Sequence, residues 1–208
     1  MPDDPPRSLE DPSATPAEDP IQPWEERASR RGDNLLIARV RHDTMRHPLT
    51  GRDFERTVLQ MPEWVNVVAR TAPTHEAPEG ALLVVRQWRF GTRATSIEIP
   101  GGIVDPGEEH PAAARRELRE ETGFTTERWT YLGSCEPNPA FQTNRCHHWL
   151  AEDCALTHPL ELDSGEDIEV ATIPWESVPG AVRDGTLAHS LVIAALARIL
   201  DLRGAPLD

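Results

Sequence analysis

The 208-residue sequence contains no lysine: all 21 of its basic residues are arginines, set against 35 acidic residues, for a formal net charge of −14. Without lysine the chain cannot form a lysine Schiff base or use the lysine of a P-loop. The acidic balance also argues against binding the nucleic-acid backbone, which needs a basic surface. A phosphorylated small molecule stays open as a substrate, because a metal ion can join carboxylates to phosphate.

Long apolar runs are also missing, so we expect no membrane-spanning helix. The acidic, proline-rich residues 1–12 do not resemble a secretory signal. The three cysteines (Cys135, Cys146 and Cys154) are an odd number without metal-ligand spacing, which predicts free thiols in a reducing compartment. We therefore expect a cytoplasmic protein that binds neither membranes nor nucleic acid.

Large apolar residues are scarce in residues 1–33, which hold seven prolines, nine acidic residues and four arginines. Such a segment cannot bury enough surface to offset its ordering entropy. We predict a flexible acidic tail over 1–33, with a partner-binding arm as the alternative. Strand-like alternation then predicts a β subdomain over 34–70, and residues 71–208 form the main domain.

The main domain alternates strand and helix signals, which predicts an α/β (α+β) fold with strands on both sides of one central helix. Strand patterns cover residues 81–89, 94–99, 129–135, 146–152 and 168–173, and helix patterns cover 111–123, 177–184 and 190–202. Pro111 suits the first turn of the central helix, and Gly123 fits its C-terminal stop.

The central helix carries three carboxylates on one face, because Glu117, Glu120 and Glu121 are related as i, i+3 and i+4. Carboxylates so close repel one another unless a hard divalent cation lies among them, and oxygen ligands favour Mg²⁺ or Mn²⁺. Such a cation keeps water molecules, one of which could attack phosphorus. The alternative is a solvated helix face with ordinary pairing, such as Arg116 with Glu120.

The spacing around these carboxylates favours the metal site. Residues 102–124 match the pattern G-x₅-E-x₇-R-E-U-x-E-E-x-G-U, where U is a bulky apolar residue, at all nine specified positions. This pattern is the Nudix box, and the sequence resembles the Nudix hydrolase family. The resemblance implies an αβα sandwich around a mixed sheet. It also implies Mg²⁺- or Mn²⁺-dependent hydrolysis of a nucleoside diphosphate linked to another group.

The resemblance also implies roles for individual residues of the box. The metal ligands would be Glu117, Glu120, Glu121 and the backbone carbonyl of Gly101, whose missing side chain would allow the close approach. Glu108 and Arg116 would be a supporting pair that neutralises and orients the carboxylates.

Segments outside the box are similar to those of ADP-ribose and nucleotide-sugar pyrophosphatases. The similarity lies in residues 85–90 (VRQWRF), in residues 96–102 (SIEIPGG), and in Pro139, fifteen residues after Phe124. In that branch an N-terminal β subdomain pairs two subunits, and residues 64–69 (WVNVVA) resemble the strand that crosses to the partner. This resemblance implies a homodimer.

Three residues ahead of the box are candidates for binding substrate. Arg86 and Arg89 would hold the diphosphate or the terminal sugar, since guanidinium is a bidentate donor to phosphate. Glu98 would bind sugar hydroxyls. The alternatives are surface salt bridges for the arginines and an exposed strand position for Glu98.

A catalytic base is expected on the loop that precedes the last strand. Glu166 is our choice, with Asp167 and Glu169 as runners-up, and a polar loop that only caps the strand is the alternative. One departure from the branch concerns specificity: Asn144 stands where the related enzymes carry an acidic residue. His147 and His148, adjacent in a strand, would face opposite sides as packing residues.

The leading hypothesis is Mg²⁺-dependent hydrolysis of the diphosphate linkage of a nucleoside diphosphate sugar such as ADP-ribose, giving a nucleoside monophosphate and a sugar phosphate. The alternatives are another diphosphate, such as a dinucleotide or a coenzyme, and a non-catalytic nucleotide sensor. Sensors usually lose box carboxylates, whereas every one is present in this sequence.

Overall fold

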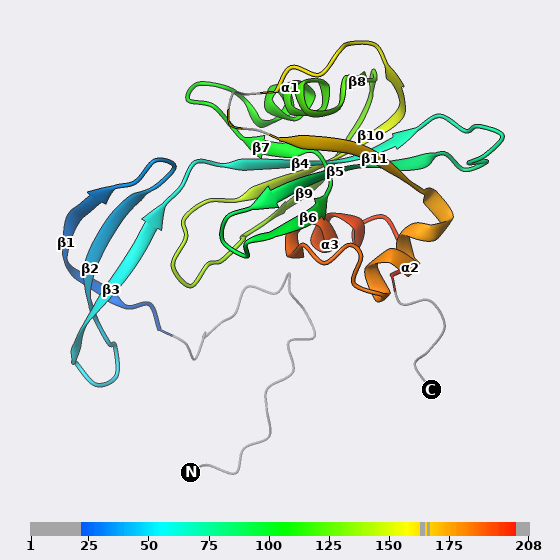
Figure 1. Cartoon of the computed structure of the whole chain (residues 1–208). Helices are drawn as coiled ribbons and strands as arrows, with labels where there is room; N and C mark the ends of the chain where they lie inside the picture. Colours follow the sequence, from blue (N-terminus) through cyan, green and yellow to red (C-terminus); the bar gives the residue numbers. More distant parts are fainter. Residues whose placement is uncertain (1–21, 163–164, 166, 203–208) are drawn as a thin grey trace, which may run out of the picture.

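A computed structural model describes residues 22–162, 165 and 167–202 of the chain. It contains an αβα sandwich and a separate three-stranded sheet that projects from one side of it (Figure 1). None of the helices in the described ranges is long and apolar enough to cross a membrane.

The middle layer of the sandwich is a mixed eight-stranded sheet, as predicted. Its central path runs β11-β5-β4-β10-β8, with β6 paired to β5, β7 to β4 and β9 to β10. Strands β4 and β10 run parallel, and the other pairs are antiparallel. The strands are β4 (Trp64–Thr71), β5 (Ala81–Arg89), β6 (Ala94–Glu98), β7 (Gly101–Ile103), β8 (Phe124–Thr125), β9 (Arg128–Cys135), β10 (Cys146–Leu156) and β11 (Ile168–Pro174).

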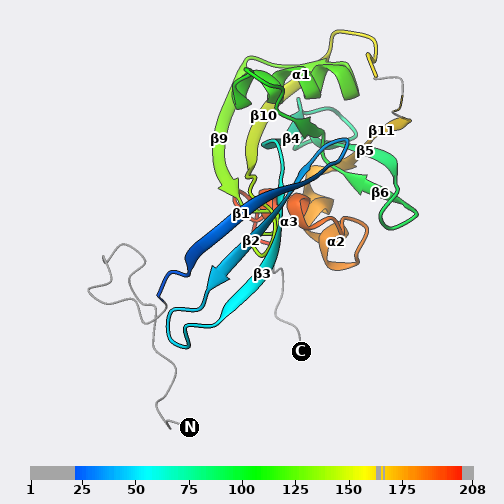
Figure 2. The same cartoon turned by 90° about the vertical axis from the view of Figure 1, so that its left-hand side faces the viewer.

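Helices cover both faces of this sheet. Helix α1 (His110–Thr122) lies on one face, and α2 (Val178–Arg183) and α3 (Ser190–Leu196) lie on the other (Figures 1 and 2). A 3₁₀ turn, η1 (Trp175–Ser177), precedes α2. The last helix is shorter than the predicted 190–202, because after Leu196 the backbone continues in tight turns, with Ile199 N–H donating to the Leu196 carbonyl.

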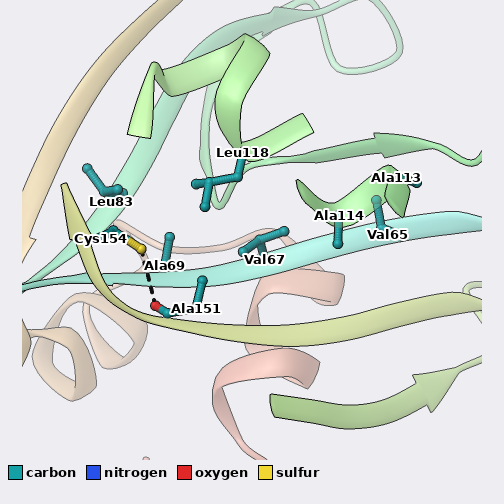
Figure 3. Close-up of a cluster of buried hydrophobic side chains, with 9 residues drawn as sticks. All are labelled: Val65, Val67, Ala69, Leu83, Ala113, Ala114, Leu118, Ala151 and Cys154. Atoms are coloured by element: carbon teal, nitrogen blue, oxygen red, sulfur yellow. Dashed lines mark hydrogen bonds between the residues drawn. The ribbon is translucent and has the colours of Figure 1, made fainter. Parts of the chain in front are cut away.

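Two hydrophobic cores fill the spaces between the layers, and the alternation of β4 divides its side chains between them. Val65, Val67 and Ala69 pack beneath Ala113, Ala114 and Leu118 of α1 (Figure 3). Val68 faces the opposite way and packs with Val192, Ala195 and Leu196 of α3. The first of these cores fixes α1 on the sheet by its apolar side chains. The carboxylates of α1 belong to neither core.

The separate sheet corrects the predicted tail. Its strands are β1 (Glu25–Asn34), β2 (Arg39–Arg46) and β3 (Asp53–Gln60), antiparallel in that order. The prediction of a tail over 1–33 is wrong from Glu25 onward, because the β1 backbone pairs along β2 and Ser29 donates a hydrogen bond to Asp43 (2.6 Å). Residues 1–21 lie outside the described part of the chain.

Strand β4 corrects the predicted domain boundary. Residues 64–70 were assigned to the N-terminal subdomain, with 64–69 as a strand that crosses to a partner. In the structure β4 is an interior strand of the central sheet of its own chain, paired with β10, β7 and β5. Its buried valines explain this position, because only a strand covered on both faces by helices hides them all.

Candidate active site

Helix α1 carries the predicted carboxylates on a rigid, buried support. Pro111 occupies its first turn, and Gly123 ends it in the left-handed conformation (φ 75°), with its N–H donating to the Arg119 carbonyl (2.8 Å). Glu117 and Glu121 are buried and Glu120 is partly exposed. The predicted start and stop of the helix are thus confirmed.

Arg116 joins three of the box carboxylates. Its Nε and Nη2 donate to the two oxygens of Glu108 (3.1 and 3.0 Å), and its Nη1 donates to Glu117 (2.8 Å) and Glu120 (3.2 Å). Its Nη2 also donates to the Ile103 carbonyl (2.9 Å), which ties the helix to β7. The structure therefore brings together the supporting pair that the sequence predicted.

The charges of this pair are stabilised by each other. The hydrogen bonds from Arg116 lower the pKa of Glu108, and the neighbouring carboxylates raise the pKa of Arg116 above its usual value. Glu108 therefore stays ionised and Arg116 stays a cation over the physiological range.

Gly101 and Gly102 bring β7 against the buried carboxylates. Gly101 N–H donates to Glu121 Oε2 (2.9 Å). A Cβ atom on Gly101 would lie 2.1 Å from the Val65 carbonyl oxygen, so the missing side chain lets β7 pair closely with β4. Close packing against β4 is thus one reason for glycine at this position, and the predicted approach of its carbonyl to a metal stays a prediction. Gly102 makes room for Glu117 in the same way.

The donor set suits a hard divalent cation in its chemistry. Glu117, Glu120 and Glu121 offer only oxygen ligands, which fits Mg²⁺ or Mn²⁺. Glu121 and Glu117 lie against the backbone of residues 101 and 102. Within the described ranges, no three acidic, histidine or cysteine side chains form a ready-made coordination shell. Arg116 instead holds one oxygen each of Glu117 and Glu120.

The three predicted substrate-binding residues are engaged in ion pairs. Arg89 donates to both oxygens of Glu98 (2.7 Å each), and Arg86 pairs with Glu169 (2.5 Å) across the β5–β11 ladder. Glu98 is buried, so the alternative of an exposed strand position is wrong. Burial would raise the pKa of Glu98, but Arg89 and His189 outweigh it and lower that pKa.

The loop expected to carry the base is described only in part. Glu166, our choice, lies outside the described residues. Asp167 directly precedes β11, and Glu169 lies in β11 opposite Arg86. Strand β11, which follows this loop, lies close to α1.

Two contacts near this loop were missed by sequence reasoning. Arg119 donates to Glu120 (3.2 Å) and to Glu161 (2.8 Å), and Glu161 N–H donates to the Glu120 carbonyl (3.0 Å). The segment that leads into the loop is thus tied to α1 beside a predicted metal ligand. Arg119 occupies an unspecified position of the box, and no spacing rule joins it to Glu161.

A histidine and aromatic cluster fixes the N-terminus of α1. Trp149 Nε1 donates to His110 Nδ1 (3.2 Å), and the His110 ring stacks on His147 (4.0 Å between centroids). His147 also contacts Tyr131 and Glu63. Burial and the neighbouring His147 lower the pKa of His110. His148 contacts Cys135 on the opposite face, so the predicted alternation of the two histidines is confirmed.

Comparison with known proteins agrees with this geometry. The sequence pattern of the NUDIX domain matches residues 65–196, well over half of the chain. The chain belongs to the Nudix family. The matched residues cover every element from β5 to α3 and leave out the sheet of β1 to β3.

Two Nudix relatives and one solved structure show how far the likeness extends. An ADP-ribose pyrophosphatase of Bacillus subtilis is 35% identical over 127 residues, 61% of this chain and 65% of that protein. The ADP compounds hydrolase NudE of Escherichia coli is 29% identical over 94 residues, 45% and 49% of the two chains. The crystal structure of an ADP compounds hydrolase shares the fold, with a TM-score of 0.75 at 20% identity over 88% of this chain and 95% of the other. The chain therefore spans less than two thirds of the length of both relatives.

Proposed function

We propose that this chain is a Nudix hydrolase that cleaves the diphosphate linkage of a nucleoside diphosphate sugar such as ADP-ribose, giving a nucleoside monophosphate and a sugar phosphate. The observation that carries the proposal is the convergence of the box carboxylates on Arg116 and on the backbone of residues 101 and 102. The likeness to an ADP-ribose pyrophosphatase supports the substrate class.

We propose Glu117, Glu120, Glu121 and the Gly101 carbonyl as the groups that hold Mg²⁺ or Mn²⁺. When bound, the cation polarises phosphoryl oxygens and lowers the pKa of water. Arg116 orients Glu117 and Glu120 by its two bonds from Nη1, and Glu108 holds the guanidinium in place. Without this pair, the clustered carboxylates would repel one another and the site would not be preorganised.

The base that accepts a proton from the attacking water is proposed to be Glu166, with Asp167 and Glu169 as alternatives. Glu169 already forms an ion pair with Arg86, so we favour Asp167 of the two described candidates. Arg119 and Glu161 anchor the segment that leads into this loop.

Arg86, Arg89 and Glu98 are proposed to bind the diphosphate and sugar. Their ion pairs hold each side chain in place before substrate arrives.

A dinucleotide or coenzyme diphosphate is the alternative substrate. The reason to test it is Asn144, which stands where the related enzymes carry an acidic residue. The Asn144 amide is buried and has no hydrogen-bond partner among the described residues. An amide both donates and accepts hydrogen bonds, whereas an ionised carboxylate at this position would only accept them.

We also propose that two copies of the chain associate through the sheet of β1 to β3. Neither hydrophobic core of the described residues includes a residue of this sheet, and most of its side chains are exposed. A three-stranded sheet with no covered face gains little stability alone. A homodimer would cover it, and light scattering of the purified protein measures the mass directly. A cytoplasmic location, without membrane or nucleic-acid partners, stays a prediction.

The activity is tested with a panel of nucleoside diphosphate sugars, dinucleotides and coenzymes, each with Mg²⁺ and with a phosphatase that releases phosphate from the monoester products. We expect the highest turnover on a nucleotide sugar, and a loss of about 10²-fold or more in Glu120→Gln and in Glu121→Gln. Glu109→Gln is the matched control, because Glu109 is exposed just ahead of the same helix. Wild-type protein that is silent on the whole panel but binds one of the compounds would replace the hydrolase by a ligand sensor.

A further inference from the structure

A concave surface lies between α1 and the chain that runs from β8 into β9. Arg115, Arg116 and Arg119 form one wall, and the other wall is formed by residues 125–127 and by Trp129. The hollow encloses about 260 Å³, and we call it the arginine groove. Because an α-helix turns about 100° per residue, Arg115 and Arg119 project nearly opposite to Glu117 and Glu121. The groove lining includes none of the proposed metal ligands, but Arg116 and Arg119 of that lining donate to Glu117 and Glu120. The groove therefore adjoins the proposed metal site without containing it.

The arginine groove is lined mainly by basic side chains in a strongly acidic protein. Its lining holds three arginines and one acidic residue, Glu127, whereas the whole chain has a net charge of −14. A concave surface lined by one sign of charge attracts ligands of the opposite sign. The groove is therefore suited to an anion.

The hydrogen-bond donors of the three arginines are committed to different extents. All N–H groups of the Arg116 guanidinium donate to Glu108, Glu117, Glu120 or the Ile103 carbonyl. Arg116 therefore offers a ligand in the groove its charge but no free donor. Arg119 uses one bond from each Nη, which leaves its Nε–H and one further N–H on each Nη.

Arg115 is the arginine best placed to receive a ligand. Its guanidinium lies 4.8 Å from the centre of the Trp129 ring, and in the described ranges it forms no ion pair with a carboxylate. Trp129 is held in turn by a bond from its Nε1 to the Thr126 carbonyl (2.9 Å). The Trp129 ring thus holds the Arg115 guanidinium at the groove without neutralising its charge.

We propose that the arginine groove binds the phosphate group of inorganic phosphate or of a phosphate monoester. Guanidinium groups bind phosphate through paired N–H donors, and Arg115 and Arg119, one turn apart on α1, supply such donors from the same face. Arg119 also donates a hydrogen bond to Glu120. The Arg119 side chain therefore links a bound phosphate to a carboxylate of the box. Phosphate binding itself does not depend on the proposed hydrolysis.

Titration calorimetry of the full chain in EDTA tests this proposal with inorganic phosphate as the probe. Without a divalent cation the box carboxylates repel phosphate, so they do not contribute. We expect saturable binding that weakens with added salt and that weakens about tenfold or more in Arg115→Gln. Arg128→Gln is the control, because Arg128 is exposed beside Trp129 but outside the groove, and pairs with Glu152 and Asp153. We expect it to bind phosphate as the wild type does.

Tryptophan fluorescence gives a second readout, because a phosphate that draws Arg115 away from Trp129 alters the emission of that ring. Trp129→Phe should remove the fluorescence change. Repeating the titration with a nucleoside monophosphate and a sugar phosphate separates the sources: equal affinity identifies a site for free phosphate, and tighter binding of a monoester identifies a site for that class. No saturable binding, or equal binding by wild type and Arg115→Gln, would overturn the proposal, whatever the activity of the protein.

Discussion

A Cβ atom placed on Gly102 would lie 2.4 Å from Oε1 of Glu117. Non-bonded carbon and oxygen atoms do not approach so closely without a shift, so the first glycine of the box and the first carboxylate of its helix are sterically coupled. A side chain at position 102 would have to displace the Glu117 carboxylate.

Gly102→Ala should therefore displace Glu117 and impair catalysis more than folding. We expect kcat to fall about 100-fold, since a small displacement of a catalytic group has effects of that order, and the free energy of unfolding to fall by about 1–3 kcal/mol. Steady-state kinetics on the best substrate and urea denaturation measure the two effects. Gly91→Ala is the matched control, because a Cβ atom there meets no atom within 4 Å. Wild-type kcat in Gly102→Ala would show that Glu117 is not needed where the structure places it.

Arg116→Gln should destabilise the protein, because it leaves Glu108, Glu117 and Glu120 without their shared cation. We expect a loss of about 1.5–3 kcal/mol in the free energy of unfolding without divalent metal. Mg²⁺ should narrow this gap, since a bound cation replaces positive charge among the same carboxylates.

The measurement for Arg116→Gln is urea denaturation with EDTA and with Mg²⁺. Arg128→Gln removes another arginine with two acidic partners, but at an exposed site, so we expect a much smaller cost that is the same in both buffers. If Mg²⁺ stabilised Arg116→Gln no more than it stabilises the wild type, the carboxylates bound by Arg116 would not be metal ligands.

Arg119 and Glu161 should act as one unit in positioning the loop that carries the base. Arg119→Gln and Glu161→Gln are each expected to lower kcat several-fold with little change in KM, because each releases the same tie between α1 and the segment after β10. The double variant should be no slower than the slower single variant. Arg183→Gln, at an exposed position of α2 on the opposite face of the sheet, is the control. Multiplicative effects in the double variant would contradict a shared role.

The parts of the site that sequence could predict are those set by local spacing. The offsets among Glu117, Glu120 and Glu121 place them on one helix face whatever the rest of the chain does, and Gly123 ends the helix by its own conformational freedom. The α/β fold class followed from strand and helix patterns of ordinary length. These predictions are confirmed because they need no knowledge of which strands are neighbours.

The remaining features depend on long-range pairing. Arg86 meets Glu169 because β5 and β11 are in register, and 83 residues of sequence separate the two. Strand β1 was predicted as a tail because it has few apolar residues, yet backbone pairing with β2 orders it. Glu166, the predicted base, lies outside the described residues.

His148 should make the protein less stable as the pH falls. Its side chain is fully buried, Nε2 lies 3.2 Å from the Cys135 sulfur, and Nδ1 has no hydrogen-bond partner among the described residues. Burial, followed by the nearby charges of Arg198 and His147, lowers the pKa of His148 from 6.5 to about 4. Between those two pH values the unfolded chain binds a proton at this residue and the folded chain does not. The free energy of unfolding should therefore fall by about 3 kcal/mol from pH 6.5 to 4 on this account, and no further below.

Comparison with His148→Gln isolates this contribution from the carboxylates that titrate over the same range. Glutamine keeps a donor toward the Cys135 sulfur but binds no proton, so its unfolding free energy should lack the His148 slope even if it starts lower. The difference between wild type and variant, measured by urea denaturation at several pH values, should then shift by about 3 kcal/mol across the window. His75→Gln, in the exposed loop between β4 and β5, should follow the wild type at every pH. A constant difference between wild type and His148→Gln would mean that His148 titrates alike in the folded and unfolded chain, which its burial in the core does not allow.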